Sequence, residues 1–315
     1  MTSVDLIIIG AGPAGLTAAQ YGARANLSVM VLEQLAPGGQ ALLIDVLENY
    51  PGIAPGKTGF EFCEDLHRQA EGFGAKFLME EVLALYKEDD TFTISLGKNK
   101  KLSAPAVILA TGAKHRPLGV PGEQEFFGRG VSYCGTCDGP LFKNKKIFVV
   151  GGGDTACDEA QYLSRLTNQL ILIHRREKFR AQKALAQRVM QNPNIEVRFN
   201  TVIKEIKGMS GKVSSVVLQA SEQKVALSEE NADAVFIFAG SIPQTSLVPG
   251  SLGVKTGEAG YIITDGRMAS SVPGLFAAGD VRASPFRQVV TAAGEGAVAA
   301  HCAAAYIDSL KGESY

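Results

Sequence analysis

The sequence predicts an α/β fold of two similar three-layer domains, with the second domain inserted into the first. A glycine-rich turn lies between an apolar strand and a helix at residues 10–15, and again at residues 151–156. The strand after each helix ends 23 positions beyond the first glycine, at Glu33 and at His174. Two copies of one β-α-β plan with buried, parallel strands are typical of Rossmann-like nucleotide-binding domains.

Each unit is expected to contain the same three elements in the same order. In the first unit, a strand, a helix and a strand are predicted at residues 6–9, 13–25 and 28–32. In the second unit, they are predicted at residues 147–150, 155–166 and 170–173. Apolar segments outside these units predict β-extensions and a tightly packed helix rich in alanine and glycine, at residues 92–96, 213–218, 224–227 and 292–307.

Two further strands indicate where the chain passes between the domains. Residues 106–112 resemble residues 234–240, and each segment is followed by a proline, Pro117 or Pro243. Prolines suit linkers, so we expect the chain to cross between domains near these two positions. The predicted domains are a first domain made of two parts, residues 1–116 and 247–315, and an inserted second domain, residues 117–246.

Composition limits the class of protein. The 315 residues are 46% hydrophobic and 20% charged, which fits two globular domains. The net charge of −1 gives no general attraction to nucleic acid or to anionic membranes. No apolar run reaches the roughly 18 residues of a membrane span, and the apolar residues 6–19 lack the basic start of a signal peptide. Five cysteines do not resemble a secreted disulfide scaffold, so we expect a cytoplasmic protein.

The two glycine-rich turns predict sites for the diphosphates of two dinucleotides. The first glycine permits a tight turn, the second lets the diphosphate approach the backbone, and the third lets helix and strand pack closely. The helix N-terminus then offers free N–H groups and partial positive charge to the phosphates. The cradle residues are Gly10, Gly12, Pro13, Ala14 and Gly15 in the first unit, and Gly151, Gly153, Asp154, Thr155 and Ala156 in the second.

The end of the second strand predicts which nucleotide each site prefers. Glu33 can accept hydrogen bonds from ribose hydroxyls, which suits the adenosine end of FAD or NAD. His174 is followed by Arg175, Arg176 and Arg180, which can bind a 2′-phosphate through charge-assisted hydrogen bonds. The second site is therefore predicted to prefer NADPH to NADH. The alternative is that these arginines form a solvated basic patch.

Other polar and glycine-containing segments are consistent with a flavin in the first site. Asp280 follows a short apolar run and Gly279, and its carboxylate could bind the ribityl chain. The loops at residues 38–40 and 48–52 could line the flavin ring, although loops of this composition are also common as simple turns.

Cys134 and Cys137 form a C-x-x-C motif just before the second glycine-rich turn, with Asp138 beside them. Such a turn often lowers the pKa of one thiol, and the resulting thiolate can attack a disulfide. Asp138 could exchange a proton with the leaving thiolate. A zinc site would need two more ligands close by, and an inert structural motif is the other alternative. The remaining cysteines are expected to be buried, at positions 63, 157 and 302.

The combination of these motifs resembles the low-molecular-weight, bacterial-type thioredoxin reductases. The resemblance runs from Gly10 to Ile307. It is carried by residues 10–15, 38–40, 48–49, 110–112, 134–138, 151–156, 174–176, 180, 279–280, 287–288 and 291–294. Two residues depart from the family pattern. Gly135 stands where alanine is commoner, and Ala41 stands where leucine is common.

The resemblance implies a homodimeric FAD enzyme that passes electrons from NADPH to thioredoxin. No metal site is expected, because the other three cysteines are scattered and no histidine is close to the C-x-x-C motif in sequence. Cys137 would accept electrons from the flavin, Cys134 would attack the thioredoxin disulfide, and Asp138 would be the acid–base group. The NADPH domain would rotate about the two linkers between these steps. The resemblance also implies further FAD contacts, at Gly39, Gln40, Asn49, Ala110, Thr111, Gly112, Gly279, Asp280, Arg287 and Gln288.

Related enzymes differ in identifiable features. A peroxiredoxin-reducing flavoprotein is expected to carry an additional N-terminal redox domain. A ferredoxin-dependent reductase would lack the arginines after His174, and a ferredoxin–NADP reductase would lack the C-x-x-C motif. The larger disulfide reductases place their dithiol soon after the first glycine-rich turn, yet residues 16–62 contain no cysteine. A nucleotide-dependent redox sensor would need no acid beside the thiols.

Overall fold

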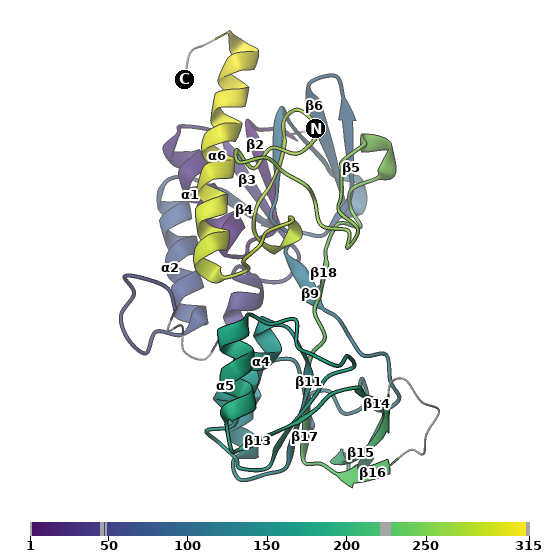
Figure 1. Cartoon of the computed structure of the whole chain (residues 1–315). Coiled ribbons are helices and arrows are strands. Elements are labelled where there is room, and N and C mark those ends of the chain that lie inside the picture. Colours follow the sequence, from purple (N-terminus) through teal and green to yellow (C-terminus); the bar gives the residue numbers. More distant parts are fainter. Residues whose placement is uncertain (1, 45–46, 48, 221–227, 313–315) are drawn as a thin grey trace. The chain divides into compact units, whose positions relative to one another are not determined.

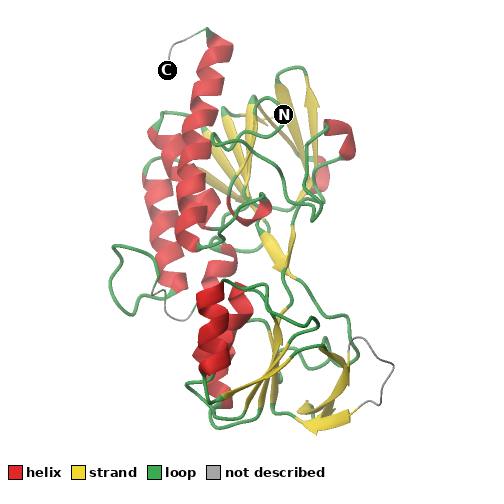
Figure 2. Ribbon diagram, in the orientation of Figure 1, coloured by secondary structure: helices red, strands yellow, loops and turns green. Residues whose placement is uncertain are grey.

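The computed structural model describes residues 2–44, 47, 49–220 and 228–312, and it divides into two compact units. The first unit comprises Met1–Lys114 and Ile242–Tyr315, and the inserted unit comprises His115–Ser241. Each unit has helices on one side of its central sheet and further strands on the other (Figures 1 and 2). The predicted fold class, two Rossmann-like domains with one inserted into the other, is confirmed.

The first unit is built on a five-stranded parallel sheet. Its order is β19-β8-β2-β3-β4, with every residue of the central strands β2 and β8 buried. The strands are β2 (Leu6–Ile9), β3 (Val29–Glu33), β4 (Lys76–Met79), β8 (Ala106–Leu109) and β19 (Leu275–Ala277). Strand β2 runs parallel to both β3 and β8, with Ile7 opposite Met30 and Val107. The first glycine-rich turn directly follows β2, so it lies at the carboxyl edge of the sheet.

Helices and an antiparallel sheet cover opposite faces of this parallel sheet. One face packs on α1 (Pro13–Arg24), α2 (Gly59–Gly72) and α6 (Val289–Lys311). The other face packs on the sheet β1-β7-β6-β5. The strands of that sheet are β1 (Thr2–Ser3), β5 (Val82–Glu88), β6 (Thr91–Leu96) and β7 (Lys101–Ala104). The β-extension predicted at residues 92–96 is therefore confirmed.

Local sequence signals explain where the helices of the first unit begin and end. Thr58 and Glu61 form a capping box at the start of α2. The helix predicted at residues 292–307 is longer at both ends, because Gln288 caps its start and the left-handed Gly312 ends it. Its small residues pack as expected, since a Cβ atom at Gly296 would lie 2.1 Å from the Ala14 carbonyl oxygen.

The inserted unit repeats the three-layer plan. Its parallel sheet has the order β10-β17-β11-β12-β13. The strands are β10 (Val131–Ser132), β11 (Ile147–Gly151), β12 (Leu170–Ile173), β13 (Ile195–Arg198) and β17 (Ala234–Phe238). One face packs on α4 (Asp154–Leu163) and α5 (Lys183–Gln191), and the other on an antiparallel sheet. That sheet consists of β14 (Thr201–Met209), β15 (Lys212–Ala220) and β16 (Ser228–Asn231).

Two details of the inserted unit differ from expectation. The helix predicted at residues 155–166 ends at Leu163 and is followed by turns. The strand predicted at residues 213–218 is present within β15, but it pairs with β14 and β16. Its expected partner at residues 224–227 lies outside the described residues.

The remaining elements are short. The two segments that connect the units form a two-stranded ribbon of β9 (Ala113–His115) and β18 (Ser241–Pro243). The C-x-x-C motif leads into α3 (Gly135–Asp138). Short 3₁₀ helices occur at Gly39–Leu43, Gly97–Asn99, Gly139–Phe142, Gly250–Leu252 and Gly279–Val281. Over the described part of the chain, none of the helices has the length and apolarity that a membrane crossing would need.

Candidate functional site

The first glycine-rich turn has the shape of a diphosphate cradle. A Cβ atom at Gly10 would lie 2.4 Å from the Ala110 carbonyl oxygen, and one at Gly15 would lie 1.9 Å from the Gly10 carbonyl oxygen. These glycines therefore let β2, β8 and α1 approach closely. At Gly12, a Cβ atom would have no heavy-atom neighbour within 4 Å. The middle glycine thus faces open space at the N-terminus of α1, where a phosphate would be received.

Glu33 ends β3 beside this turn. Its Oε2 accepts the Ala11 N–H at 2.8 Å, and its Oε1 accepts the N–H groups of Gln34 and Leu35 at 2.9 and 3.1 Å. These bonds fix the carboxylate at the edge of the cradle. A carboxylate has about four acceptor positions, so capacity remains for the hydroxyls of a ribose.

The loop after β3 lies against the same turn. A Cβ atom at Gly39 would lie 3.2 Å from the Gly12 Cα, and the Gln40 amide donates to the Ala113 carbonyl oxygen. The Asn49 amide donates to Gln288 Oε1 at 2.9 Å, so two residues far apart in sequence are brought together. The neighbouring Glu48 lies outside the described residues.

Thr111 lies between Ala110 and Gly112, just after the end of β8. The Thr111 hydroxyl donates to the Gln244 carbonyl oxygen at 2.7 Å, and the Gln244 amide donates back to the Thr111 carbonyl oxygen at 2.5 Å. Gly112 has a φ of 68° in the left-handed region, which turns the chain sharply after the strand. Thr111 and Gly112 are therefore held at the carboxyl edge of the first sheet.

Asp280 lies in the turn after β19. Burial raises the pKa of its carboxyl group, Arg287 opposes this shift, and Glu295 adds to it. The preceding Gly279 has a φ of 75° and donates its N–H to Glu295 Oε2 at 2.8 Å. Arg287 also lies over the ring of Tyr261, 4.1 Å from its centroid.

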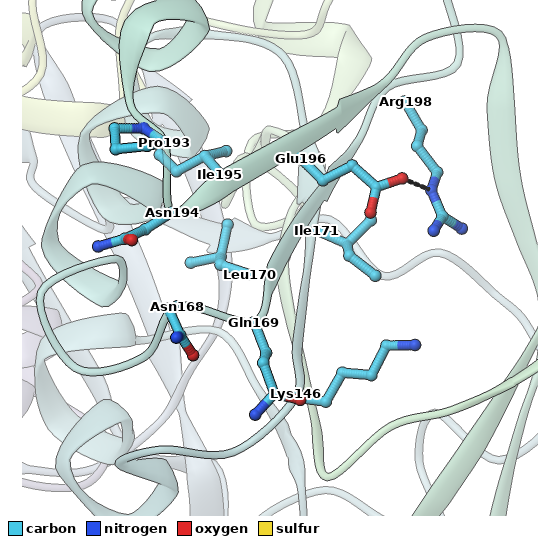
Figure 3. Close-up of a pocket in the computed structure, with 10 residues that line it drawn as sticks. All are labelled: Lys146, Asn168, Gln169, Leu170, Ile171, Pro193, Asn194, Ile195, Glu196 and Arg198. Atoms are coloured by element: carbon cyan, nitrogen blue, oxygen red, sulfur yellow. Dashed lines mark hydrogen bonds and ion pairs between the residues drawn. The ribbon is translucent and has the colours of Figure 1, made fainter.

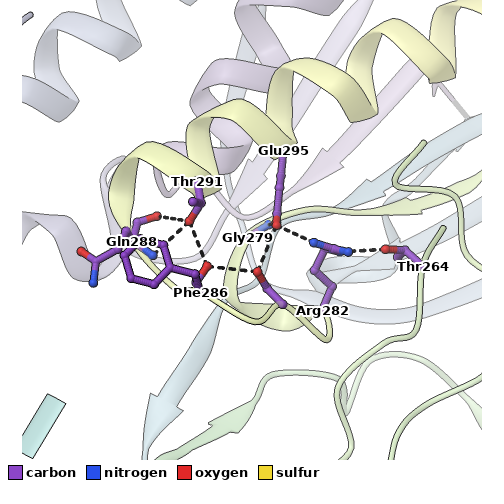
Figure 4. Close-up of polar contacts among 8 residues, drawn as sticks. Thr264, Gly279, Arg282, Phe286, Gln288, Thr291 and Glu295 are labelled. Carbon is purple, nitrogen blue, oxygen red and sulfur yellow. Dashed lines mark hydrogen bonds and ion pairs between the residues drawn. The ribbon is translucent and has the colours of Figure 1, made fainter. Parts of the chain in front are cut away.

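Glu295 is the centre of a network that the sequence analysis missed (Figure 4). Its carboxylate pairs with Arg282, and only 13% and 12% of the two side chains are exposed. Arg282 also donates to the Thr264 hydroxyl at 2.7 Å, while the Ser284 hydroxyl donates to Glu295 Oε1 at 3.3 Å. This network fixes the backbone on both sides of Asp280. Glu295 directly follows the motif at residues 291–294, and this position was the signal in the sequence by which it could have been found.

The start of α6 completes this side of the site. The Gln288 N–H donates to the Thr291 hydroxyl at 3.1 Å, and that hydroxyl lies 3.1 Å from the Phe286 carbonyl oxygen (Figure 4). The first unit therefore brings the turns at Gly12, Asn49 and Gln288 to the carboxyl edge of its sheet.

The second glycine-rich turn repeats the first cradle. A Cβ atom at Gly151 would lie 2.5 Å from the Phe238 carbonyl oxygen, whereas one at Gly153 would have no neighbour within 4 Å. Asp154 begins α4, and its Oδ1 accepts the Gln182 N–H at 2.7 Å. Thr155 is exposed and Ala156 is buried, so the helix again presents an open N-terminus next to a tightly packed turn.

His174 supports this turn from within the unit. Its side chain is 5% exposed, its ring stacks near Phe179, and a Cβ atom at Gly152 would lie 2.3 Å from its Nδ1. Its Nε2 is buried without a hydrogen-bond partner among the described residues. The structure thus places His174 behind the glycine turn rather than on its open face.

Three arginines gather at the end of β12. Burial lowers the pKa of His174, and the charges of Arg180, Arg176 and Arg175 lower it further. All three arginines are exposed, and within the described ranges no carboxylate forms an ion pair with Arg176 or Arg180. The Arg180 N–H also donates to the Gly152 carbonyl oxygen at 2.7 Å. This edge of the cradle is therefore positively charged and suits a phosphate group.

The C-x-x-C motif contains a disulfide-bonded cysteine. Cys134 is in a disulfide, whereas the side chain of Cys137 lies outside the described residues. Cys63, Cys157 and Cys302 are free and buried, as predicted. Burial raises the pKa of the Cys63 thiol to about 12 and that of Cys157 to about 11, so neither is an available thiolate near neutral pH.

Hydrogen bonds fix the backbone of this redox turn, residues 134–138. The Cys134 N–H donates to the Ser132 hydroxyl at 3.0 Å, and that hydroxyl donates to the Cys134 carbonyl oxygen at 3.2 Å. Cys134 Sγ lies 3.5 Å from the Thr136 hydroxyl, and the Asp138 N–H donates to the Cys134 carbonyl oxygen. Asp138 is half-buried within α3, one helical turn from Cys134.

Glu123 connects the redox turn to the segment that enters the inserted unit, and the sequence analysis missed it. The Tyr133 hydroxyl donates to Glu123 Oε1 at 2.8 Å, and the N–H groups of Leu118 and Gly119 donate to Glu123 at 2.8 and 2.7 Å. His115 stacks on Tyr133 with ring centroids 5.5 Å apart. Burial and the hydrogen bond to Glu123 raise the pKa of Tyr133, so it stays a neutral donor.

A hollow of about 370 Å³ lies at the opposite edge of the inserted sheet, where β11, β12 and β13 begin (Figure 3). Lys146 and Arg198 border it. Both pair with Glu230, and Arg198 also pairs with Glu196. The cations are neutralised, and the hollow lies at the strand ends remote from the glycine turn, so we assign it no ligand.

The chain is similar to known proteins over almost its whole length. Residues 4–296 match the pyridine nucleotide-disulphide oxidoreductase family. A thioredoxin reductase of Treponema pallidum is 54% identical over 311 residues, which cover 98% of this chain and 99% of the relative.

Solved structures agree with this similarity. The crystal structure of Lactococcus lactis thioredoxin reductase (FR conformation) is 40% identical with a TM-score of 0.84, over 97% of this chain and 99% of that chain. The crystal structure of T. acidophilum thioredoxin reductase is 36% identical with a TM-score of 0.82, over 98% of this chain and 100% of that chain. The span that matches the family, residues 4–296, includes both glycine-rich turns and the C-x-x-C motif.

Proposed function

Because the chain belongs to the thioredoxin reductases, within the pyridine nucleotide-disulphide oxidoreductase family, we propose that its electrons pass from NADPH through FAD to a Cys134–Cys137 disulfide. The enzyme reduces the disulfide of thioredoxin, and its cofactors are FAD and NADPH. When bound, the flavin supplies two-electron transfer between a reduced nicotinamide and a disulfide. The observation that carries the proposal is the disulfide at Cys134, in the unit that also contains the arginine-rich cradle.

The first cradle fits FAD. The open face at Gly12 and the N-terminus of α1 receive the diphosphate, and Glu33 accepts hydrogen bonds from the adenosine ribose. Asp280 is held at the end of β19, where its carboxyl group can bind the ribityl hydroxyls. The remaining contacts carried over from the family motifs are Gly39, Gln40, Asn49, Ala110, Thr111, Gly112, Arg287 and Gln288.

The second cradle fits NADPH. Gly153 leaves room for the diphosphate, and Asp154 connects the start of α4 to the loop that carries Arg180. The exposed guanidinium groups of Arg175, Arg176 and Arg180 supply charge-assisted hydrogen bonds to a 2′-phosphate. His174 contributes by supporting Gly152 from behind.

The two cysteines have different roles in this proposal. Cys137 accepts the electron pair from the flavin, and Cys134 attacks the disulfide of thioredoxin. Asp138, one helical turn from Cys134, exchanges the proton with the leaving thiolate. Because the dithiol and the NADPH cradle belong to one unit, they cannot face the flavin of the other unit at the same time. We therefore propose that the inserted unit rotates between the two electron transfers.

We further propose a homodimer that works in the cytoplasm with thioredoxin as its partner. The family resemblance supports the dimer, and three free, buried cysteines fit a reducing compartment. We retain the predicted domain division, which the compact units support: an FAD domain of residues 1–116 and 247–315 around an NADPH domain of residues 117–246. Light scattering of the purified holoenzyme measures the oligomeric state directly.

The proposed electron path is tested with the purified protein and a thioredoxin. We expect bound FAD in the visible spectrum, and NADPH oxidation that depends on thioredoxin. Cys134→Ser should still allow NADPH to reduce the flavin but should abolish thioredoxin reduction. Full activity of Cys134→Ser, or a well-folded protein that binds no FAD, would contradict the proposal. Replacing NADPH by reduced ferredoxin separates this enzyme from ferredoxin-dependent relatives.

A further inference from the structure

Glu159 lies on α4 and faces the residue that follows Cys134. A Cβ atom at Gly135 would lie 2.2 Å from Glu159 Oε2 and 3.5 Å from a methyl carbon of Leu163. The carboxyl group therefore occupies the space that the side chain of an alanine would need at position 135. Position 135 is one of the two at which the sequence departs from the family pattern.

The carboxyl group of Glu159 is only partly satisfied. The backbone N–H of Gly135 donates a hydrogen bond to it. Oε2 is buried and has no hydrogen-bond partner among the described residues, and no lysine, arginine or histidine described in the structure pairs with Glu159. An unpaired buried carboxylate is costly.

The surroundings of Glu159 favour its protonated form. Burial raises the pKa of its carboxyl group to about 7, the charge of Asp158 adds to the shift, and the hydrogen bond from Gly135 opposes it. Among the elements packed against α4, α3 contributes the charged residue Asp138, and α5 contributes Lys183 and Arg188. The charge of Arg188 lowers the pKa of the neighbouring Asp158, while burial raises it. The side chain of Glu159 therefore lies against the redox turn at Gly135, with a pKa raised above that of a free glutamate.

We propose that Glu159 is a positioning residue of the redox turn, which holds the Cys134–Gly135 peptide and places a second acidic group, besides Asp138, against the turn at the residue next to Cys134. The hydrogen bond from the Gly135 N–H fixes the peptide that connects the two residues. The absence of a side chain at Gly135 lets the carboxyl group approach the backbone. The inference rests on the proposed role of Cys134 as the thiol that attacks thioredoxin.

The charge of Glu159 controls how readily Cys134 ionises. A nearby anion disfavours a second negative charge, so ionised Glu159 raises the pKa of the Cys134 thiol. Removing that charge without changing the side-chain size should lower the pKa of Cys134. An alanine at position 135 should act in the same direction, because its Cβ displaces the carboxyl group from the turn.

The experiment measures the pKa of Cys134 in the reduced, full-length holoenzyme. A Cys137→Ser background leaves Cys134 as the thiol to be titrated, since the other three cysteines are buried. The rate of alkylation by iodoacetamide is recorded against pH. We expect Glu159→Gln to lower the pKa of Cys134 by up to about one unit. Gly135→Ala should give a smaller shift in the same direction, and it provides a second test should Glu159→Gln fold poorly.

Glu125→Gln is the matched control, because it removes an exposed carboxylate from the same unit. It should leave the pKa of Cys134 unchanged. An unchanged pKa in both Glu159→Gln and Gly135→Ala would overturn the role of Glu159. A different result, full thioredoxin reduction by Cys134→Ser, would instead overturn the proposed function on which the inference rests.

Discussion

Three glutamates hold backbone turns beside the residues assigned to chemistry. Glu295 binds the N–H of Gly279 next to Asp280, and Glu159 binds the N–H of Gly135 next to Cys134. Glu123 binds Tyr133 and the backbone at Leu118. In each case a carboxylate from a different segment fixes a peptide that the chemistry depends on, so the precision of the site comes from residues outside the motifs.

Glu295→Gln tests this role in the first unit. The substitution keeps the side-chain size but removes the charge opposite Arg282, which leaves a buried cation without its partner. Losing one partner of a buried pair typically costs about 3–5 kcal/mol of unfolding free energy. We expect a lower thermal stability and faster release of FAD, measured by flavin fluorescence. Glu64→Gln, which removes an exposed partner of Arg68, should change neither quantity measurably.

Arg175→Ala combined with Arg176→Ala tests the choice of nucleotide. Each charge-assisted hydrogen bond to a phosphate contributes about 1.5–3 kcal/mol, so the KM for NADPH should rise at least about tenfold. The KM for NADH should change little, because NADH has no 2′-phosphate. Arg165→Ala removes an exposed arginine at the other end of α4 and is the control. Equal effects on NADPH and NADH would identify the arginines as a general basic patch.

Candidate residues could be located from the sequence where one contiguous motif contains the whole signal, and their roles toward cofactors and substrate stay predictions. The glycine spacings, Glu33 and the two cysteines belong to this group. His174 was correctly located at the end of β12, but its burial behind Gly152 was not visible in the sequence. Glu123, Glu159 and Glu295 were missed because their partners come from other segments and only the folded chain brings them together.

At the scale of elements, the same β-α-β design occurs in both units, and the corresponding glycines have the same kind of surroundings. Gly10 approaches the carbonyl oxygen of the residue just after β8, and Gly151 approaches that of the last residue of β17, whereas Gly12 and Gly153 face open space. The predicted strands agree with the structure to within one residue at β2, β3, β11 and β12. Helix ends were harder to predict, because caps such as Gln288 with Thr291 depend on side-chain geometry.

Alanine substitutions at Gly12 and Gly15 should separate ligand binding from folding. Gly12 has a φ of −70°, which alanine accepts, and its Cβ would meet no neighbour. Gly12→Ala should therefore leave the stability of the apoprotein unchanged but reduce FAD content, because the methyl group occupies the diphosphate position.

Gly15→Ala is the matched variant, since its Cβ would lie 1.9 Å from the Gly10 carbonyl oxygen. It should lower the thermal stability of the apoprotein, because α1 must move away from β2. Thermal unfolding and bound FAD are measured for both variants. If Gly12→Ala retained normal FAD content, the open face at Gly12 would not be the diphosphate site.

At the scale of the whole molecule, the cradle proposed for FAD belongs to one unit, while the cradle proposed for NADPH and the redox turn belong to the other. Two chain segments connect the units, and they pair as the short ribbon of β9 and β18. The sequence predicted the insertion because proline-containing linkers follow two similar strands. It could not predict Glu123, which ties the entering segment at Leu118 to Tyr133 beside Cys134.

Solvent viscosity tests whether the inserted unit must move during turnover. Domain motions of this kind often limit turnover and are slowed by solvent friction. If rotation limits the rate, doubling the viscosity with sucrose should lower kcat for thioredoxin reduction by up to about twofold. NADPH oxidation with ferricyanide, which takes electrons directly from the flavin, needs no presentation of the dithiol and should be less affected. Rapid mixing then locates the slowed step, which should lie between flavin reduction and dithiol reduction. Viscosity-independent rates for that step would argue against rotation and in favour of a fixed arrangement of the two units.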